Sequence, residues 1–484
     1  MIVRSGLVGL LAEFKRSFMP DDDSTQKAEA DRLLSQGFTD FFFTKQYQAA
    51  IQALQQAKTL YQAIDDRQGE ADALRRLSEV YSRLGQHQES IEFLVTAARL
   101  YQAVGNLGGE AKCLEGLGMT YRDLDQPQTS KDFLNQALVL YRNSGNRTEE
   151  ANLLNSLGVL EDILGHSTQA IEFYQQALQI ARTESDPRET LAPLKNLGSV
   201  YYAIGVYEQA VSYRLQHLAL VQQLGDWHKE AESYAQLGVA YCAMEQYPQG
   251  IDCYLQGLEM YRELGDRHSE VQLLNYLGYA FYNSGQSDRG IEQLQAAIAV
   301  AGTLENREPK IYSINNLAKI YSASGQYAQV IAVAQQLLAL VQSVGNRLGE
   351  AEVLHDIAIA HNRLEQHQAA VQYHEQAIAL YQELQHRYGE ARSCYALGST
   401  YLRLGHPQAA IPLYQQSVAL YQAIGDPQGE MEALSHAGLA YSALGQHPAA
   451  QNCFMQAQQL ARALEDDVAE ASILDALNRM RELS

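Results

Sequence analysis

Four histidines in one short stretch are the side chains in this sequence that come nearest to a metal site. They are His355, His361, His367 and His374. A bound metal needs ligands that converge on one point, whereas helical spacing places these four on different faces, with one of them in a turn. We therefore predict that they are packing and surface residues, and that the protein holds no metal.

The sequence motifs that usually accompany catalysis are missing from the chain. It contains no GxxxxGK[ST] phosphate loop, no GxSxG nucleophile turn and no HExxH metal motif. Gly116-Leu117-Gly118 resembles part of a dinucleotide-binding loop, but it lies within a helical pattern that no strand precedes. We predict no catalytic residues, no cofactor and a protein that is not an enzyme.

The charge and the cysteines restrict the partners and the compartment. The 484 residues include 36 Lys and Arg against 57 Asp and Glu, a formal net charge of -21, and so acidic a chain repels a phosphate backbone. The five cysteines form no CxxC pair, which is typical of a reducing compartment. No stretch approaches the roughly 18 apolar residues that span a bilayer. We expect a cytoplasmic protein that binds no nucleic acid.

A repeat with a period of 40 residues predicts the elements that position every side chain. A glutamate recurs at Glu70, Glu110, Glu150, Glu230, Glu270, Glu350, Glu390, Glu430 and Glu470. Seven residues after it comes an apolar residue, then a small one, and three residues later usually an aromatic one, as in Leu117, Gly118 and Tyr121. That spacing marks one face of a helix.

Each repeat unit is predicted to form two antiparallel helices. A glycine such as Gly85 ends the first helix and one such as Gly105 ends the second, since glycine accepts the left-handed geometry of a helix end. The Asp or Asn that follows, for example Asn106, can cap the next helix. Glycine inside a helix costs up to about 1 kcal/mol relative to alanine, so the repeated small residue implies that the two helices cross closely.

These motifs resemble the tetratricopeptide repeat family, in the 40-residue form typified by kinesin light chain and the spindle-orientation adaptors. The resemblance implies an all-α fold, a right-handed α-solenoid (superhelix) of about eleven helix pairs with a C-terminal capping helix. We divide the chain into an N-terminal amphipathic segment and linker at 1–26, the repeats at 27–470 and the capping helix at 471–484.

The resemblance also implies a peptide-binding groove. In the family, positions 2, 5, 6, 9, 12 and 13 of each first helix line the concave side; here position 1 is residue 71, 111 and every fortieth residue after. The residues that this predicts for the groove are Asn155, Lys195, Asn196, Tyr202, Gln236, Asn275, Tyr276, Tyr279, Tyr282, Asn315, Asn316, Lys319, His355, Arg363, Arg392, Tyr395 and Arg403.

The residue types indicate how such a groove would bind. A row of asparagines offers donors and acceptors to the backbone of an extended peptide, and tyrosines offer rigid contact area. The alternative is that the asparagines are ordinary exposed polar residues. Arg363, Arg392 and Arg403 form a basic patch that suits an acidic segment, unless Asp356 or Glu352 pairs with them.

The sequence thus favours a non-enzymatic scaffold or adaptor that binds an extended, acidic-ended segment of a partner protein. Two alternatives stay open: a peptide-sensing regulator, and an assembly subunit of a larger enzyme complex. In residues 1–20, Val3, Leu7, Leu10 and Phe14 share one helical face. We expect that face to dock on the first repeat rather than on a membrane surface or a partner.

Overall fold

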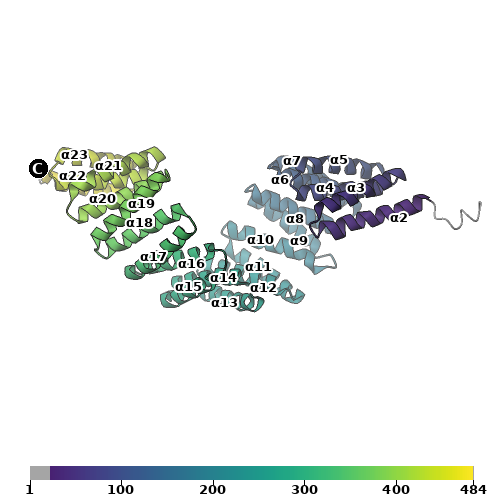
Figure 1. The fold of residues 1–484 in the computed structure, drawn as a ribbon, viewed down its shortest axis with the longest axis horizontal. Helices are drawn as coiled ribbons and strands as arrows, with labels where there is room; N and C mark the ends of the chain where they lie inside the picture. Colours follow the sequence, from purple (N-terminus) through teal and green to yellow (C-terminus); the bar gives the residue numbers. More distant parts are fainter. Residues whose placement is uncertain (1–21, 483–484) are drawn as a thin grey trace, which may run out of the picture. The chain divides into compact units, whose positions relative to one another are not determined.

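The computed structural model describes residues 22–482, and every regular element in that range is helical. It contains 23 α-helices in successive pairs, a short π-helix and one 3-10 turn, with no strand in that range. Figure 1 shows each helix lying beside the next along the chain. The predicted all-α solenoid of helix pairs is confirmed. The prediction for residues 1–20 falls outside the described residues.

The chain divides into two compact units, residues 1–233 and 234–484. The first unit contains α2 (Asp22–Ser35), the π-helix η1 (Gln36–Phe42), α3 (Tyr47–Ala63), α4 (Arg67–Arg83), α5 (His87–Ala103), α6 (Leu107–Asp123), α7 (Pro127–Ser144), α8 (Arg147–Ile163), α9 (Ser167–Ala181), the 3-10 turn η2 (Pro187–Thr190), α10 (Leu191–Ala203) and α11 (Tyr207–Leu224). The boundary between the units falls inside α12 (Trp227–Ala243).

The second unit contains α13 (Tyr247–Leu264), α14 (Arg267–Asn283), α15 (Ser287–Ala301), α16 (Glu308–Ala323), α17 (Tyr327–Ser343), α18 (Arg347–Arg363), α19 (His367–Glu383), α20 (Arg387–Arg403), α21 (Pro407–Ile424), α22 (Pro427–Ala443), α23 (His447–Ala463) and α24 (Asp467–Glu482). The final helix starts before residue 471, because the side chain of Asp466 accepts a hydrogen bond from the backbone N–H of Ala469 at 2.9 Å. At the other end, α2 starts at Asp22, inside the segment that we had assigned to the linker.

The helix ends have the geometry that the sequence predicts. Gly85 and Gly105 both have φ of 72°, and the side chain of Asn106 accepts a hydrogen bond from the backbone N–H of Gly109 at 2.9 Å. Some units use another residue in the left-handed position, such as Glu365 with φ of 60°. The capping role of the Asp or Asn is confirmed.

The recurrent glutamate joins neighbouring pairs, a role that the sequence did not reveal. Glu270, in the first turn of α14, accepts hydrogen bonds from Arg262 at the end of α13 and from Arg267, at 2.8 and 2.7 Å. Burial raises the pKa of Glu270, but the two guanidinium groups outweigh it and hold that pKa below its ordinary value. The same arrangement holds Glu150 against Arg142 and Arg147.

The small residue of the first helix makes room for a side chain of the second. A Cβ atom on Gly118 would lie 2.6 Å from the side chain of Leu134, and one on Gly278 would lie 2.6 Å from that of Leu294. The predicted close crossing is therefore confirmed. The space that glycine leaves is filled by a large side chain located 16 residues further along.

Within each unit the first helices form one layer and the second helices another. First helices of neighbouring pairs contact each other, as α14 does α16 and α18 does α20. We call the surface of this first-helix layer, at the six groove positions, the inner face. No helix in residues 22–482 has the length and hydropathy that a bilayer span requires.

Candidate functional site

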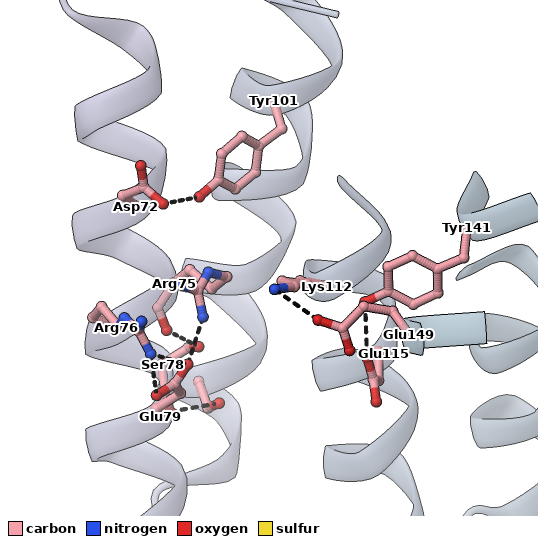
Figure 2. Close-up of polar contacts among 11 residues, drawn as sticks. Asp72, Arg75, Arg76, Ser78, Glu79, Tyr101, Lys112, Glu115, Tyr141 and Glu149 are labelled. Atoms are coloured by element: carbon pink, nitrogen blue, oxygen red, sulfur yellow. Dashed lines mark hydrogen bonds and ion pairs between the residues drawn. The ribbon is translucent and has the colours of Figure 1, made fainter. Parts of the chain in front are cut away.

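The cations on the inner face of the first unit are paired with carboxylates (Figure 2). Arg75 lies 2.6 Å and Arg76 lies 3.2 Å from Glu79, all three on α4. Lys112 on α6 lies 2.9 Å from Glu149 on α8. Burial lowers the pKa of Arg75, but Glu79 outweighs it and raises that pKa overall. These charges are neutralised within the protein.

Acidic side chains on the same face accept hydrogen bonds from buried tyrosines of the second helices (Figure 2). The hydroxyl of Tyr101 donates to Asp72 at 2.6 Å, and that of Tyr141 donates to Glu115 at 3.0 Å. Burial, with the neighbouring carboxylates, raises the pKa of both phenols. Burial also raises the pKa of Glu115, despite the hydrogen bond from Tyr141.

The groove residues predicted in the first unit are likewise engaged internally. Asn196 on α10 donates to the side-chain oxygen of Asn155 on α8 at 2.9 Å, and both are half-buried. Lys195 forms an ion pair with Glu232 at 2.8 Å. The guanidinium of Arg214 lies 5.0 Å from the ring centre of half-buried Tyr202. The structure brings these side chains into contact with one another.

Two predicted groove asparagines in the second unit lie below the surface. Asn275 on α14 and Asn316 on α16 are only 1% and 2% exposed. Asn316 donates to the side-chain oxygen of Asn275 at 2.9 Å, Asn275 donates to Ser313, and Tyr279 donates to Asn316. We expected both amides to face the groove. The structure instead buries them, because they satisfy each other between neighbouring first helices.

Predicted tyrosines of the second unit remain partly at the surface. Tyr276, Tyr279 and Tyr282 are half-buried on α14, and the hydroxyl of Tyr276 accepts a hydrogen bond from Gln272 at 2.8 Å. Gln236 on α12 is exposed. Half-buried rings on one helix offer contact area to a ligand without a large loss of side-chain entropy.

His355 also lies inside the protein rather than on the groove. It is 1% exposed, its Nδ1 lies 2.9 Å from the hydroxyl oxygen of Ser393, and its ring centre lies 5.3 Å from that of His374. Burial lowers the pKa of His355 well below its ordinary value and that of His374 to about 4. Among residues 22–482, no group of three or more potential His, Cys, Asp or Glu ligands is arranged to hold a metal.

The basic patch of the second unit contrasts with the paired cations of the first. Arg363 and Arg403 are exposed and Arg392 is half-buried. Among the described residues, none of the three lies within 4 Å of a carboxylate, although Arg392 lowers the pKa of Asp356 through its charge. Tyr395, beside Arg392 on α20, has its hydroxyl 3.2 Å from a ring nitrogen of His436.

A cavity of about 320 Å³ opens on the inner face between α16, α17 and α18. It is lined by Asn315, Ala318, Lys319, Ser322, Tyr327, Val330, Ala334, Leu337, Val353, Asp356, Ile359 and Ala360. Of the predicted groove residues, Asn315 and Lys319 contribute to it. Burial raises the pKa of Asp356, partly offset by the Arg392 guanidinium. The sequence analysis missed the cavity; its signal was Ala334, which stands where other units have a large side chain.

The model of the tetratricopeptide repeat matches residues 39–103, 110–183, 189–263, 310–383, 350–423 and 390–463. The chain belongs to the tetratricopeptide repeat family. Tetratricopeptide repeats are typical of protein–protein interaction scaffolds, and members of this family are typically not catalytic. No curated protein sequence matches the chain.

Solved tetratricopeptide structures share the fold at low sequence identity. A signal transduction ATPase with a tetratricopeptide repeat sensor from Pyrococcus horikoshii is 12% identical, with 87% of this chain and 67% of that chain covered and a TM-score of 0.50. BtubC from P. vanneervenii is 17% identical, with 46% and 92% covered and a TM-score of 0.41. A putative kinesin light chain repeat protein from Podosopora anserina is 22% identical, with 41% and 97% covered and a TM-score of 0.36.

Proposed function

We propose that this tetratricopeptide repeat protein is a non-enzymatic scaffold or adaptor that binds an extended peptide segment of a partner protein on the inner face of its second unit. The observation that carries the proposal is the combination of cations without carboxylate partners and an open, largely apolar cavity on that face. An internally satisfied face, such as that of the first unit, offers a ligand little to replace.

The chemistry of the face favours an acidic segment. Lys319, Arg363 and Arg403 are exposed, so a ligand carboxylate can reach each of them without first breaking an ion pair. The chain as a whole carries a charge of -21, which repels an acidic partner at long range. Since screening limits electrostatic interactions to about 8 Å at physiological ionic strength, the local arginines decide the sign of the field that a docked segment meets.

The test uses peptides selected on the full chain from a displayed random dodecapeptide library. Their dissociation constants are then measured for Arg363→Glu combined with Arg403→Glu. Reversal of both charges should weaken binding about tenfold or more, since about 1.4 kcal/mol corresponds to a factor of ten. Binding to the unchanged chain should also weaken as salt rises.

A matched control keeps the same change in net charge away from the inner face. Arg307 and Arg387 are exposed and stand between helix pairs, outside the six groove positions. Arg307→Glu combined with Arg387→Glu should leave the affinity for the selected peptides almost unchanged. Equal losses in both double variants would mean that only net charge matters, and would refute a site on the inner face.

A further inference from the structure

The second helices carry one large side chain at a fixed repeat position, with a single exception. The residues at this position are Leu54, Leu94, Leu134, Tyr174, Arg214, Tyr254, Leu294, Ala334, His374, Tyr414 and Phe454. In pairs such as Gly278 with Leu294, and Gly438 with Phe454, the large side chain fills the space over the small residue of the first helix. Ala334 breaks the series, because a methyl group cannot fill that space.

The missing side chain accounts for the location of the cavity. Ala318 and Ala334 both line it, and its apolar wall is completed by Val330, Leu337 and Val353. These three are almost completely buried by the rest of the protein. Voids in a core destabilise it in proportion to their volume, so an unfilled space over Ala334 is a site where an added apolar group gains packing contacts.

The mouth of the cavity is polar and accessible. Lys319 and Asp356 line it from α16 and α18, and Ile359 beside them is 37% exposed. The side chains of Asn315 and Lys319 have no hydrogen-bond or ion-pair partner among residues 22–482. An apolar interior with a few polar groups at its rim is the usual composition of a ligand pocket.

We infer that the cavity over Ala334 receives one aromatic or large aliphatic side chain of the bound peptide, and that Lys319 pairs with an acidic residue next to that anchor. The inference rests on the proposed function and specifies its ligand. An engineered apolar cavity of about 150 Å³ binds benzene, so about 320 Å³ has room for a phenyl or indole ring. The vacant core position thus becomes a specificity pocket.

The experiment fills the cavity with the side chains that neighbouring pairs use. Ala318→Gly combined with Ala334→Leu reproduces the Gly278 and Leu294 pair, and Ala334→His reproduces the pair formed by Ala358 and His374. Both variants should fold, because each copies a pair already present in the chain. The control is Ala332→Leu, which adds the same side chain at an exposed position of the same helix.

Two probes are measured on each variant: the peptides selected from the random library, and N-acetyl-phenylalanine methylamide by saturation-transfer NMR. Selected peptides should share an aromatic or large aliphatic residue beside an acidic one. Both cavity-filling variants should bind them roughly ten- to a hundredfold more weakly, in proportion to the apolar area that is no longer buried. The NMR signal of the small probe should disappear in these variants and persist in Ala332→Leu.

The outcomes separate the two proposals. If the cavity-filling variants keep full peptide affinity while reversal of Arg363 and Arg403 abolishes it, the groove binds peptide without this pocket and the inference is overturned alone. If neither set of variants changes peptide affinity, both the site and the pocket are overturned. Should the Gly and Leu double variant fail to fold, Ala334→His gives the same decision.

Discussion

The inner faces of the two units are built from the same helix positions but present different surfaces. In the first unit, Arg75, Arg76 and Lys112 form ion pairs with carboxylates of their own unit. In the second unit, Arg363 and Arg403 have no carboxylate within 4 Å among the described residues. The repeat frame therefore supplies positions, and the side chains placed there decide whether a face is closed by internal pairing or left open for a ligand.

A matched pair of asparagine contacts shows the same difference in burial. Asn196 donates to Asn155 in the first unit and Asn316 donates to Asn275 in the second, at 2.9 Å in both cases. The first contact is half-buried and the second is buried. Water can replace a lost partner in the first contact but not in the second, so equal hydrogen bonds should have unequal effects on stability.

The largest expected effect on folding comes from the buried acceptor. Asn275→Ala should lower the free energy of unfolding of α14 and α16 by roughly 2–3 kcal/mol, because a buried polar group left without a partner costs about 1–3 kcal/mol. The amide N–H groups of Asn316 would lose their acceptor. Hydrogen exchange of the backbone amides in the two helices measures the local change.

The matched change in the first unit is Asn155→Ala, which removes the acceptor of Asn196. It should lower the local stability of α8 and α10 by less than about 1 kcal/mol, since the half-buried amide can bond to water. Similar losses at both sites would show that burial does not distinguish the two faces.

Acid should weaken the second unit through its buried histidines. The pKa of His374 is lowered from 6.5 to about 4 by burial, so between those values the unfolded chain binds more protons than the folded one, and stability falls as pH falls. For this one group the loss between pH 7 and pH 5 amounts to roughly 2 kcal/mol. Thermal unfolding measured across this pH range tests the size and the sign.

The control for the pH effect is His374→Leu, since leucine occupies this position in α15 as Leu294. Its stability should change less between pH 7 and pH 5 than that of the unchanged chain. His355 stays in the variant and keeps its own contribution of the same sign, because burial and the charge of Arg392 lower its pKa too. An identical pH dependence in both proteins would assign the effect to other groups.

The smallest expected effect on folding would convert part of the first face into the second kind. Glu79→Gln removes the carboxylate shared by Arg75 and Arg76. Folding should weaken by only about 0.5–1 kcal/mol, the usual size for partly exposed pairs. The variant should bind a hexaglutamate peptide more tightly than the unchanged chain, as measured by isothermal titration.

Glu149→Gln is the companion change, because it releases Lys112 in the same way. The guanidinium of Arg76 is also held 3.6 Å from the ring centre of Phe38, so Lys112 is the freer cation of the two. If neither variant gains affinity for hexaglutamate, unpaired charge alone does not make an inner face able to bind, and the cavity of the second unit carries more weight.

Local sequence signals predicted the frame correctly. The interval of 40 residues, the left-handed glycines such as Gly105 and the capping residues such as Asn106 act within a few residues of one another, so they can be seen in the sequence. The requirement for a small residue at Gly278 was also predicted. What filled the space, Leu294, lay 16 residues away and was not predicted.

The candidate site was predicted only in part, for the same reason. The repeat register placed Asn275, Asn316 and His355 at groove positions correctly, but not at the surface. Their burial depends on partners in the next repeat, such as Ser313 and Ser393, 38 residues further along in each case. The cavity likewise needed the walls of α16, α17 and α18 together.

The sequence by itself determined the helix pairs, their turns and the register of the inner face, because these follow from interactions within one unit and from a period that repeats along the whole chain. Only the tertiary structure decided which polar side chains on that face are satisfied and which remain available. A hydrogen bond such as that from Asn316 to Asn275 joins helices of different units. Its formation depends on packing geometry that no local pattern encodes.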